Sequence, residues 1–352
     1  MSWRDKRVYS VDKNGDLYGV DDEGNNSSAV WNFNLTSGQA MDIVIDAESN
    51  FITVTNQNGN ISKYEQTATG VTKKWDYNFT EASNGCRKIG ADKYNRYYAA
   101  STSSNTFIRF SEDKDGNPVR DWTYTWSGGT GAWAFAIDEK GYVALGTAGN
   151  EIRLIDPEGN HVWTFTGAND TIRDVNFDAE GNIYALQEYN QRFFKINREG
   201  TEVWRYTDLE SRMFGTSITK DKDIYLVGWE GNLLYIKEDG EGTPQEQWKI
   251  DLSPGQTGFD GLTHQVAAKP DNSKFFVCGY GSIESIFKLV EDEQGNPEIV
   301  WEDDRMQDEV REVRTHYEFQ GTWPAHFGLV GFGTNKAING IKRTLGGVVR
   351  GY

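Results

Sequence analysis

Three arginines and one tryptophan recur at a single offset in this sequence, and their types suit the binding of an anion or a sugar. Arg87, Trp133 and Arg173 each lie five residues before an aspartate that closes a short apolar run, and Arg311 begins a similar run later in the chain. Guanidinium groups bind carboxylates and phosphates through paired hydrogen bonds, and an indole ring offers a flat apolar face. The four residues are candidate ligand-binding residues, unless each arginine pairs with a neighbouring carboxylate such as Asp174.

Residue spacing elsewhere indicates neither a metal site nor an activated nucleophile. The four histidines lack the spacing of zinc ligands, and no serine lies in a G-x-S-x-G motif. Acidic, glycine-containing turns such as 113–117 recur just before a strand in several units, which favours hairpin turns over calcium loops. Cys86 and Cys278 are too few for a disulfide framework. The sequence therefore predicts no metal, no cofactor and no catalytic residue.

A repeated unit of strands and turns organises the chain around these residues. Its clearest copies are 138–165 and 178–206, which share an aspartate, a glycine turn and a terminal V-W-x-aromatic. Seven tryptophans, 41 to 53 residues apart, mark the last strand of each unit. That period is typical of four-stranded propeller blades, in which the tryptophans would pack between blades. The tryptophans are Trp31, Trp75, Trp122, Trp163, Trp204, Trp248 and Trp301.

The first unit lacks its innermost strand, which indicates how the ring closes. Residues 8–24 align with the second and third strands of the model unit, and the late run 310–315 resembles the start of an innermost strand. Pairing of the two terminal strands would leave no free edge. We expect an all-β propeller of four-stranded antiparallel blades, with seven blades favoured. Residues 326–352 could instead supply an eighth blade.

In such a propeller the recurrent offset lies at the start of each innermost strand, so its residues should ring one mouth of the central channel. When the units are aligned on the acid that ends the innermost strand, the position five residues before it is Met41, Arg87, Trp133, Arg173, Thr216 and Gln265, with Arg311 in the closing strand. Tryptophans outside the repeat, Trp126 and Trp229 among them, are further candidates for a sugar-binding surface.

The recurrent pattern D-x-x-G-x-x-Y-A…D-x-x-G-x-x-x-W resembles the pyrroloquinoline-quinone-type (PQQ-like) β-propeller repeat superfamily over residues 8–319. The resemblance implies the propeller architecture, and the superfamily contains both quinone dehydrogenases and non-catalytic assembly scaffolds. A quinone enzyme would be expected to show an adjacent cysteine pair and acidic calcium ligands. The cysteines here are single, so a non-catalytic member is predicted.

Charge divides the chain into two parts. The net charge is −17, which disfavours nucleic-acid binding. After Glu318 there are four cations and no acid, which leaves −21 on the remainder. We expect a propeller over 1–319 and a basic, glycine-rich arm over 320–352 that docks on an acidic protein surface. Its partner-binding candidates are Lys336, Lys342, Arg343 and Arg350.

These features favour a non-enzymatic structural or protein-interaction module in a homo-oligomer or larger assembly, with a virion capsid-decoration or tail component as the first candidate. The alternatives are a carbohydrate- or anion-binding propeller and a quinone-dependent, metal-dependent or glycan-cleaving enzyme. No apolar stretch approaches a membrane span, and the first ten residues lack the apolar core of a signal peptide. A cytoplasmic or virion location is therefore expected, without membrane insertion.

Overall fold

A computed structural model describes most of the 352-residue chain. Within the described part, the regular structure is β-strand apart from one 3-10 turn, η2 (Thr80–Ala82). No helix there is long and apolar enough to cross a membrane. The described residues are 7–12, 14–35, 40–46, 51–56, 58–82, 85–128, 131–209, 211–219, 221–228, 232–251, 261–268, 275–281, 286–303 and 310–315.

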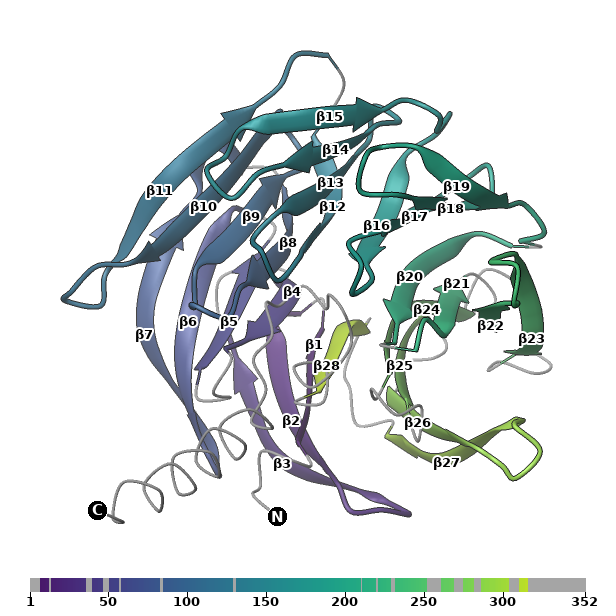
Figure 1. The fold of residues 1–352 in the computed structure, drawn as a ribbon. Coiled ribbons are helices and arrows are strands. Elements are labelled where there is room, and N and C mark those ends of the chain that lie inside the picture. Colours follow the sequence, from purple (N-terminus) through teal and green to yellow (C-terminus); the bar gives the residue numbers. More distant parts are fainter. Residues whose placement is uncertain are drawn as a thin grey trace, which may run out of the picture.

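The described strands form seven four-stranded antiparallel sheets, numbered here as blades in chain order (Figure 1). Blade 1 contains β28 (Val310–Thr315), β1 (Arg7–Asp12), β2 (Asp16–Asp22) and β3 (Ser27–Asn34). Blade 2 contains β4 (Ala40–Ile45), β5 (Phe51–Asn56), β6 (Asn60–Thr67) and β7 (Gly70–Asn78). Blade 3 contains β8 (Cys86–Ala91), β9 (Tyr97–Ser101), β10 (Thr106–Glu112) and β11 (Pro118–Thr125).

The later blades follow the same order from the inside outward. Blade 4 contains β12 (Ala132–Ile137), β13 (Val143–Thr147), β14 (Ile152–Ile155) and β15 (His161–Phe165). Blade 5 contains β16 (Ile172–Phe177), β17 (Ile183–Gln187), β18 (Arg192–Ile196) and β19 (Glu202–Tyr206). Blade 6 contains β20 (Met213–Ile218), β21 (Ile224–Gly228), β22 (Asn232–Glu238) and β23 (Pro244–Asp251). Blade 7 contains β24 (Gly261–Ala268), β25 (Phe275–Gly281), β26 (Ile286–Glu291) and β27 (Pro297–Asp303).

Closure of the ring through both ends of the chain is confirmed. The late strand β28 pairs antiparallel with β1, with Val8 opposite Thr315 and Ser10 opposite Val313, and Figure 1 shows the two strands side by side. The pairing gives blade 1 the innermost strand that its own segment lacks, so β1 is paired on both sides and blade 1 has four strands like the others.

The eight-blade alternative needs correction. Each innermost strand contacts the next in the order β28, β4, β8, β12, β16, β20, β24 and back to β28, so the ring of described strands has no gap for another sheet. Residues 326–352, which would have built the additional blade, lie outside the described residues, as does the boundary at 319/320.

The turn after each innermost strand explains why the aspartate recurs. In blade 4 the Asp138 carboxylate accepts hydrogen bonds from the backbone N–H groups of Lys140 and Tyr142, at 2.9 and 2.8 Å. A side chain that satisfies two turn amides favours the hairpin over other local structures. Asp92 and Asp178 make the same contacts in blades 3 and 5.

The outermost strands carry the repeat tryptophans at equivalent positions, as predicted. In every blade a β-bulge falls immediately before the tryptophan, so the same register recurs in all seven pairings of the third and fourth strands. Five of the tryptophans use the indole N–H to reach the next blade. Their acceptors are Glu112 for Trp75, Pro157 O for Trp122, Arg198 O for Trp163, Glu238 for Trp204 and Glu291 for Trp248.

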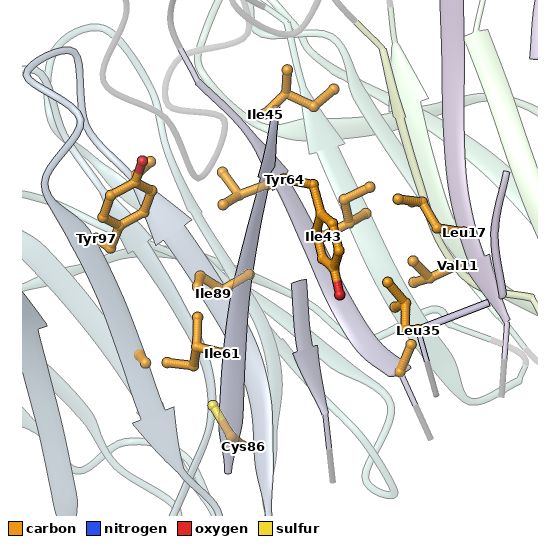
Figure 2. Packing of buried hydrophobic residues seen from close by; sticks show 14 of the residues in the cluster. Val11, Leu17, Leu35, Ile43, Ile45, Ile61, Tyr64, Cys86, Ile89 and Tyr97 are labelled. Atoms are coloured by element: carbon orange, nitrogen blue, oxygen red, sulfur yellow. The ribbon is translucent and has the colours of Figure 1, made fainter. Parts of the chain in front are cut away.

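The core lies between blades rather than within one layer. Among the described residues it falls into five clusters, and each cluster draws its side chains from neighbouring blades. Figure 2 shows part of the first cluster, where Ile43 and Ile61 of blade 2 lie close to Ile89 of blade 3. Because each blade face is covered by the next blade, the ring must be complete to bury all of them.

One contact between blades gives the fold a predictable response to acid. Arg120 of β11 donates to both carboxylate oxygens of Glu81, at 2.6 and 3.0 Å, and lowers the pKa of Glu81 from 4.5 to about 2. Since the charged carboxylate is favoured in the folded state, its stabilising contribution is present above pH 4.5 and is lost as pH falls through 2.

We therefore expect Glu81→Gln to be less stable than the wild-type protein at neutral pH, with a difference that shrinks progressively as pH falls below 4.5. Urea unfolding midpoints of both proteins, measured across this range, test the expectation. A difference that did not change with pH would show that the Arg120–Glu81 pair contributes nothing through its charge.

Candidate functional site: the channel mouth

Every innermost strand has a β-bulge, within its first four residues, and the bulged residues form a ring at one mouth of the channel. The register shift occurs once in each pairing of the first and second strands. A bulge redirects a side chain and commonly lies beside a functional site. The bulged residues are Met41, Arg87, Trp133, Arg173, Phe214, His264 and Arg311.

Two members of the predicted ring were wrong. The sequence placed Thr216 and Gln265 on the ring, whereas the bulges in blades 6 and 7 fall at Phe214 and His264. In blade 6 the turn residue is Thr219, whose hydroxyl accepts from the Asp223 N–H at 3.1 Å. Counting from Asp221, the first acid in that turn, therefore gave a position two residues too late.

Trp133 joins two of the predicted arginines. The Arg87 guanidinium lies 4.5 Å from the centroid of the Trp133 ring, and that of Arg173 lies 5.1 Å from it. Both distances are within the range of cation–π attraction. The three side chains come from β8, β12 and β16, so the structure brings together three of the four predicted residues from three consecutive blades.

The contacts continue beyond the predicted set into blade 6. Arg173 also lies 5.0 Å from the ring centroid of Phe214, and Arg212 lies 5.4 Å from the same centroid. Arg212 precedes β20, in the connector between blades 5 and 6. The result is an alternating series of cations and rings, here called the mouth ladder, whose members are Arg87, Trp133, Arg173, Phe214 and Arg212.

The outer end of the ladder is fixed by a buried carboxylate. Arg212 forms an ion pair with Glu188, which follows β17 and has only 5% of its side chain exposed. The same guanidinium lies 4.1 Å from the ring centroid of Tyr189. The sequence pattern did not reveal Glu188, Tyr189 and Arg212 because they lie in connectors, outside the repeat. Phe214 lies within the repeat and was missed only because the count in blade 6 began at the wrong residue.

The carboxylate that the sequence offered as a partner for Arg173 binds the neighbouring blade. Asp174 is buried, and its carboxylate accepts from the Thr216 N–H and hydroxyl of blade 6, at 2.8 and 2.9 Å. Asp42 makes a similar link from blade 2 to the Ile89 N–H of blade 3, at 2.9 Å. Each of these carboxylates follows the bulged residue of its strand and hydrogen-bonds its blade to the next one.

The remaining predicted residues have different outcomes. Arg311 lies on the ring by its backbone register, while its side chain, Trp229 and the cations Lys336, Lys342, Arg343 and Arg350 lie outside the described residues. Trp126 is buried and stacks on Tyr124 with ring centroids 5.8 Å apart, so it offers no open face for a sugar.

The described residues near the mouth offer little for covalent catalysis. Cys86, next to Arg87, is fully buried, and burial together with the Asp42 charge raises the pKa of its thiol. A thiol with a raised pKa is a poor nucleophile. Across the described part of the chain, no group of three or more His, Cys, Asp or Glu side chains is arranged to hold a metal ion.

The closed ring of four-stranded blades makes this chain a β-propeller. Solved structures with the same fold include a protein of Bacteroides fragilis, provisionally assigned as a 6-phosphogluconolactonase, with a TM-score of 0.73 and 12% identity over 89% of this chain and 99% of that one. A protein from Lactobacillus plantarum gives a TM-score of 0.71 at 12% identity, covering 88% and 98%.

The WD40 propeller domain of Doa1 is also similar, with a TM-score of 0.66 and 14% identity over 84% of this chain and 92% of that domain. No family model and no curated protein matches the sequence. At these identities the similarity establishes the propeller fold alone.

Proposed function

We propose that the protein is a binding module that recognises an anionic ligand at the channel mouth and acts without catalysing a reaction. The observation that carries the proposal is the placement of Arg87 and Arg173 on one indole ring, that of Trp133. A carboxylate or phosphate is the chemical group that this arrangement suits.

Physical chemistry connects the arrangement to an anion in two steps. Both guanidinium groups lie within 5.1 Å of one ring centroid, so the two charges are at most about 10 Å apart, roughly one Debye length. An anion bound within reach of both guanidinium groups would be attracted by the two charges together. Stacking on aromatic rings orients the guanidinium planes in advance, which reduces the entropy lost on binding.

The negative charge of the rest of the protein restricts where an anionic ligand can bind. With a net charge of −17 the body repels anions, so an anionic ligand is attracted only where cations are concentrated. The ladder gathers three arginines across blades 3 to 6, which supports binding of an anion at the mouth.

Replacement of either arginine by methionine is expected to weaken binding of galacturonate or inorganic phosphate at least about tenfold, because hydrogen bonds to charged groups contribute about 1.5–3 kcal/mol each. Titration calorimetry at low and physiological salt would measure this for Arg87→Met and Arg173→Met. Lys74→Met is the matched control, since Lys74 pairs with Glu65 on the outer strands of blade 2. Wild-type binding that survives both arginine variants would overturn the proposal.

An enzymatic alternative has one supporting observation. The similar Bacteroides fragilis protein is provisionally assigned as a lactonase of a phosphorylated sugar acid, and this chain covers 99% of its length. Such a substrate also carries an anion. Hydrolysis of 6-phosphogluconolactone by the purified protein, abolished in Arg173→Met, would replace the binding-only proposal with this one.

We also propose that the module is part of a larger assembly, with a virion capsid or tail as the first candidate. We further propose that it belongs to the PQQ-like superfamily. Support comes from the complete repeat and the opposite charges of the body and the 320–352 segment. Mass measurement of the purified protein in solution tests the assembly, and a strictly monomeric species that binds no further protein would contradict it.

A further inference from the structure

Tyr189 combines high exposure with a fixed position, and its neighbours suit a sugar. It lies in the turn between β17 and β18, and 58% of its surface is exposed. Exposed aromatic side chains that are held rigidly contribute to binding at little entropic cost. The Arg212 guanidinium, 4.1 Å from the ring centroid and paired with Glu188, restrains the ring.

The backbone of the turn is restrained as well. The Tyr189 N–H donates to the Asp170 carboxylate at 3.1 Å, and the Glu188 N–H donates to Thr171 O at 3.0 Å. The other oxygen of Asp170 accepts from the Thr171 N–H at 2.7 Å. The turn of blade 5 is thus tied to the connector that enters the same blade, and the Tyr189 ring projects from a preorganised frame.

Amide and guanidinium side chains from the same turn and from the connector that enters blade 5 are hydrogen-bonded to one another. The Asn169 side-chain oxygen accepts from Gln187 at 2.6 Å and from Arg192 at 3.1 Å, and Asn190 donates to it at 3.4 Å. Planar polar side chains with both donors and acceptors can bind the hydroxyl groups of a sugar. The C–H groups of a pyranose face carry a small positive charge and pack on the negative face of an aromatic ring.

We infer that Tyr189 forms a second subsite, which stacks one pyranose ring of an acidic oligosaccharide whose carboxylate is held by the mouth ladder. Arg212 connects the two subsites because it contacts both Tyr189 and Phe214, and Phe214 contacts Arg173. The inference rests on the proposed function and names its ligand class. A peptide fits less well, since a tight turn offers no strand edge for pairing.

The test compares a trisaccharide with its monosaccharide by titration calorimetry. We expect Tyr189→Ala to weaken binding of trigalacturonate about tenfold while binding of galacturonate is unchanged, and Tyr189→Phe to retain trisaccharide binding because the ring remains. Tyr94→Ala is the matched control. Tyr94 is also a turn tyrosine with an arginine over its ring, at 5.0 Å, and is 67% exposed, but it follows the end of β8 rather than the mouth.

The outcomes separate this inference from the proposed function. Galacturonate binding that requires Arg87 and Arg173, together with trigalacturonate binding that Tyr189→Ala does not weaken, would overturn the inference and leave the proposed function intact. Failure of both sugars to bind would overturn the inference, and failure of inorganic phosphate to bind as well would overturn the proposed function. Equal binding of a neutral trisaccharide such as maltotriose would also overturn the inference, since the ladder would then select no charge.

Discussion

Replacing Lys288 by methionine is expected to reduce the free energy of unfolding by about 3–5 kcal/mol, the loss seen when one partner of a buried ion pair is removed. Lys288 of blade 7 donates to the Asp22 carboxylate at 2.8 Å and to Gly24 O at 2.6 Å, in blade 1. Both side chains of the pair are less than 10% exposed. The variant would leave the Asp22 charge buried without this cation.

The position of this pair makes its loss more severe than that of a similar pair elsewhere. It joins residues 266 positions apart, across the seam where the first and last blades meet. The chain passes from blade 7 into blade 1 only as β28. The other three strands of blade 1 are therefore held to blade 7 by the β28–β1 pairing and by contacts between the two blades. Weakening the seam allows the ring to open, which exposes the faces of two blades.

Urea unfolding measures the change in the free energy of unfolding. Two further variants test whether the loss in Lys288→Met comes from the buried Asp22 charge. Lys288→Met combined with Asp22→Asn should recover part of the stability, because the uncompensated charge is gone. Lys74→Met, in a pair about half exposed on each side, should cost no more than about 1 kcal/mol. If Lys288→Met cost no more than Lys74→Met, the proposed role of the seam would be wrong.

The fold followed from the sequence because its local signals repeat. A turn aspartate recurs in several units and a late tryptophan in all seven, and each recurrence has one structural cause. Asp138 satisfies turn amides, and the tryptophans follow equivalent bulges. The missing first strand of unit one then specified the partner of β1. A late segment with the pattern of an innermost strand was the one candidate, and β28 fills that place.

The candidate site was harder to predict because its chemistry depends on contacts between blades. The offset located Arg87, Trp133 and Arg173, but nothing in the sequence shows that two guanidinium groups share one indole ring. In blade 6 the turn residue is Thr219 instead of an aspartate. Counting back from the next acid in the turn therefore selected Thr216 instead of Phe214. Tyr189 lies in a connector with no repeated pattern, so only the folded structure reveals its contact with Arg212.

Replacing Trp75 by alanine is the second change with a large expected effect, a loss of about 3–5 kcal/mol in the free energy of unfolding. The Trp75 side chain donates to Glu112 of blade 3 and packs edge-on against Tyr97 and Phe110, with centroids 5.7 and 6.0 Å away. The residue is 8% exposed. Lys63 pairs with the same carboxylate, so truncation also disturbs an ion pair between blades.

The repeat alone predicts an equal loss for every one of these tryptophans, and the structure separates them. Trp163 is only partly buried, and its acceptor is the backbone oxygen of Arg198 rather than a carboxylate. Trp163→Ala should therefore cost less than Trp75→Ala, and Trp75→Phe should lie between them because it keeps the packing but leaves Glu112 with one donor fewer. Chemical denaturation of the three variants tests this order. Equal losses for Trp163→Ala and Trp75→Ala would show that packing of the ring, and not the link to Glu112, determines the contribution of each tryptophan.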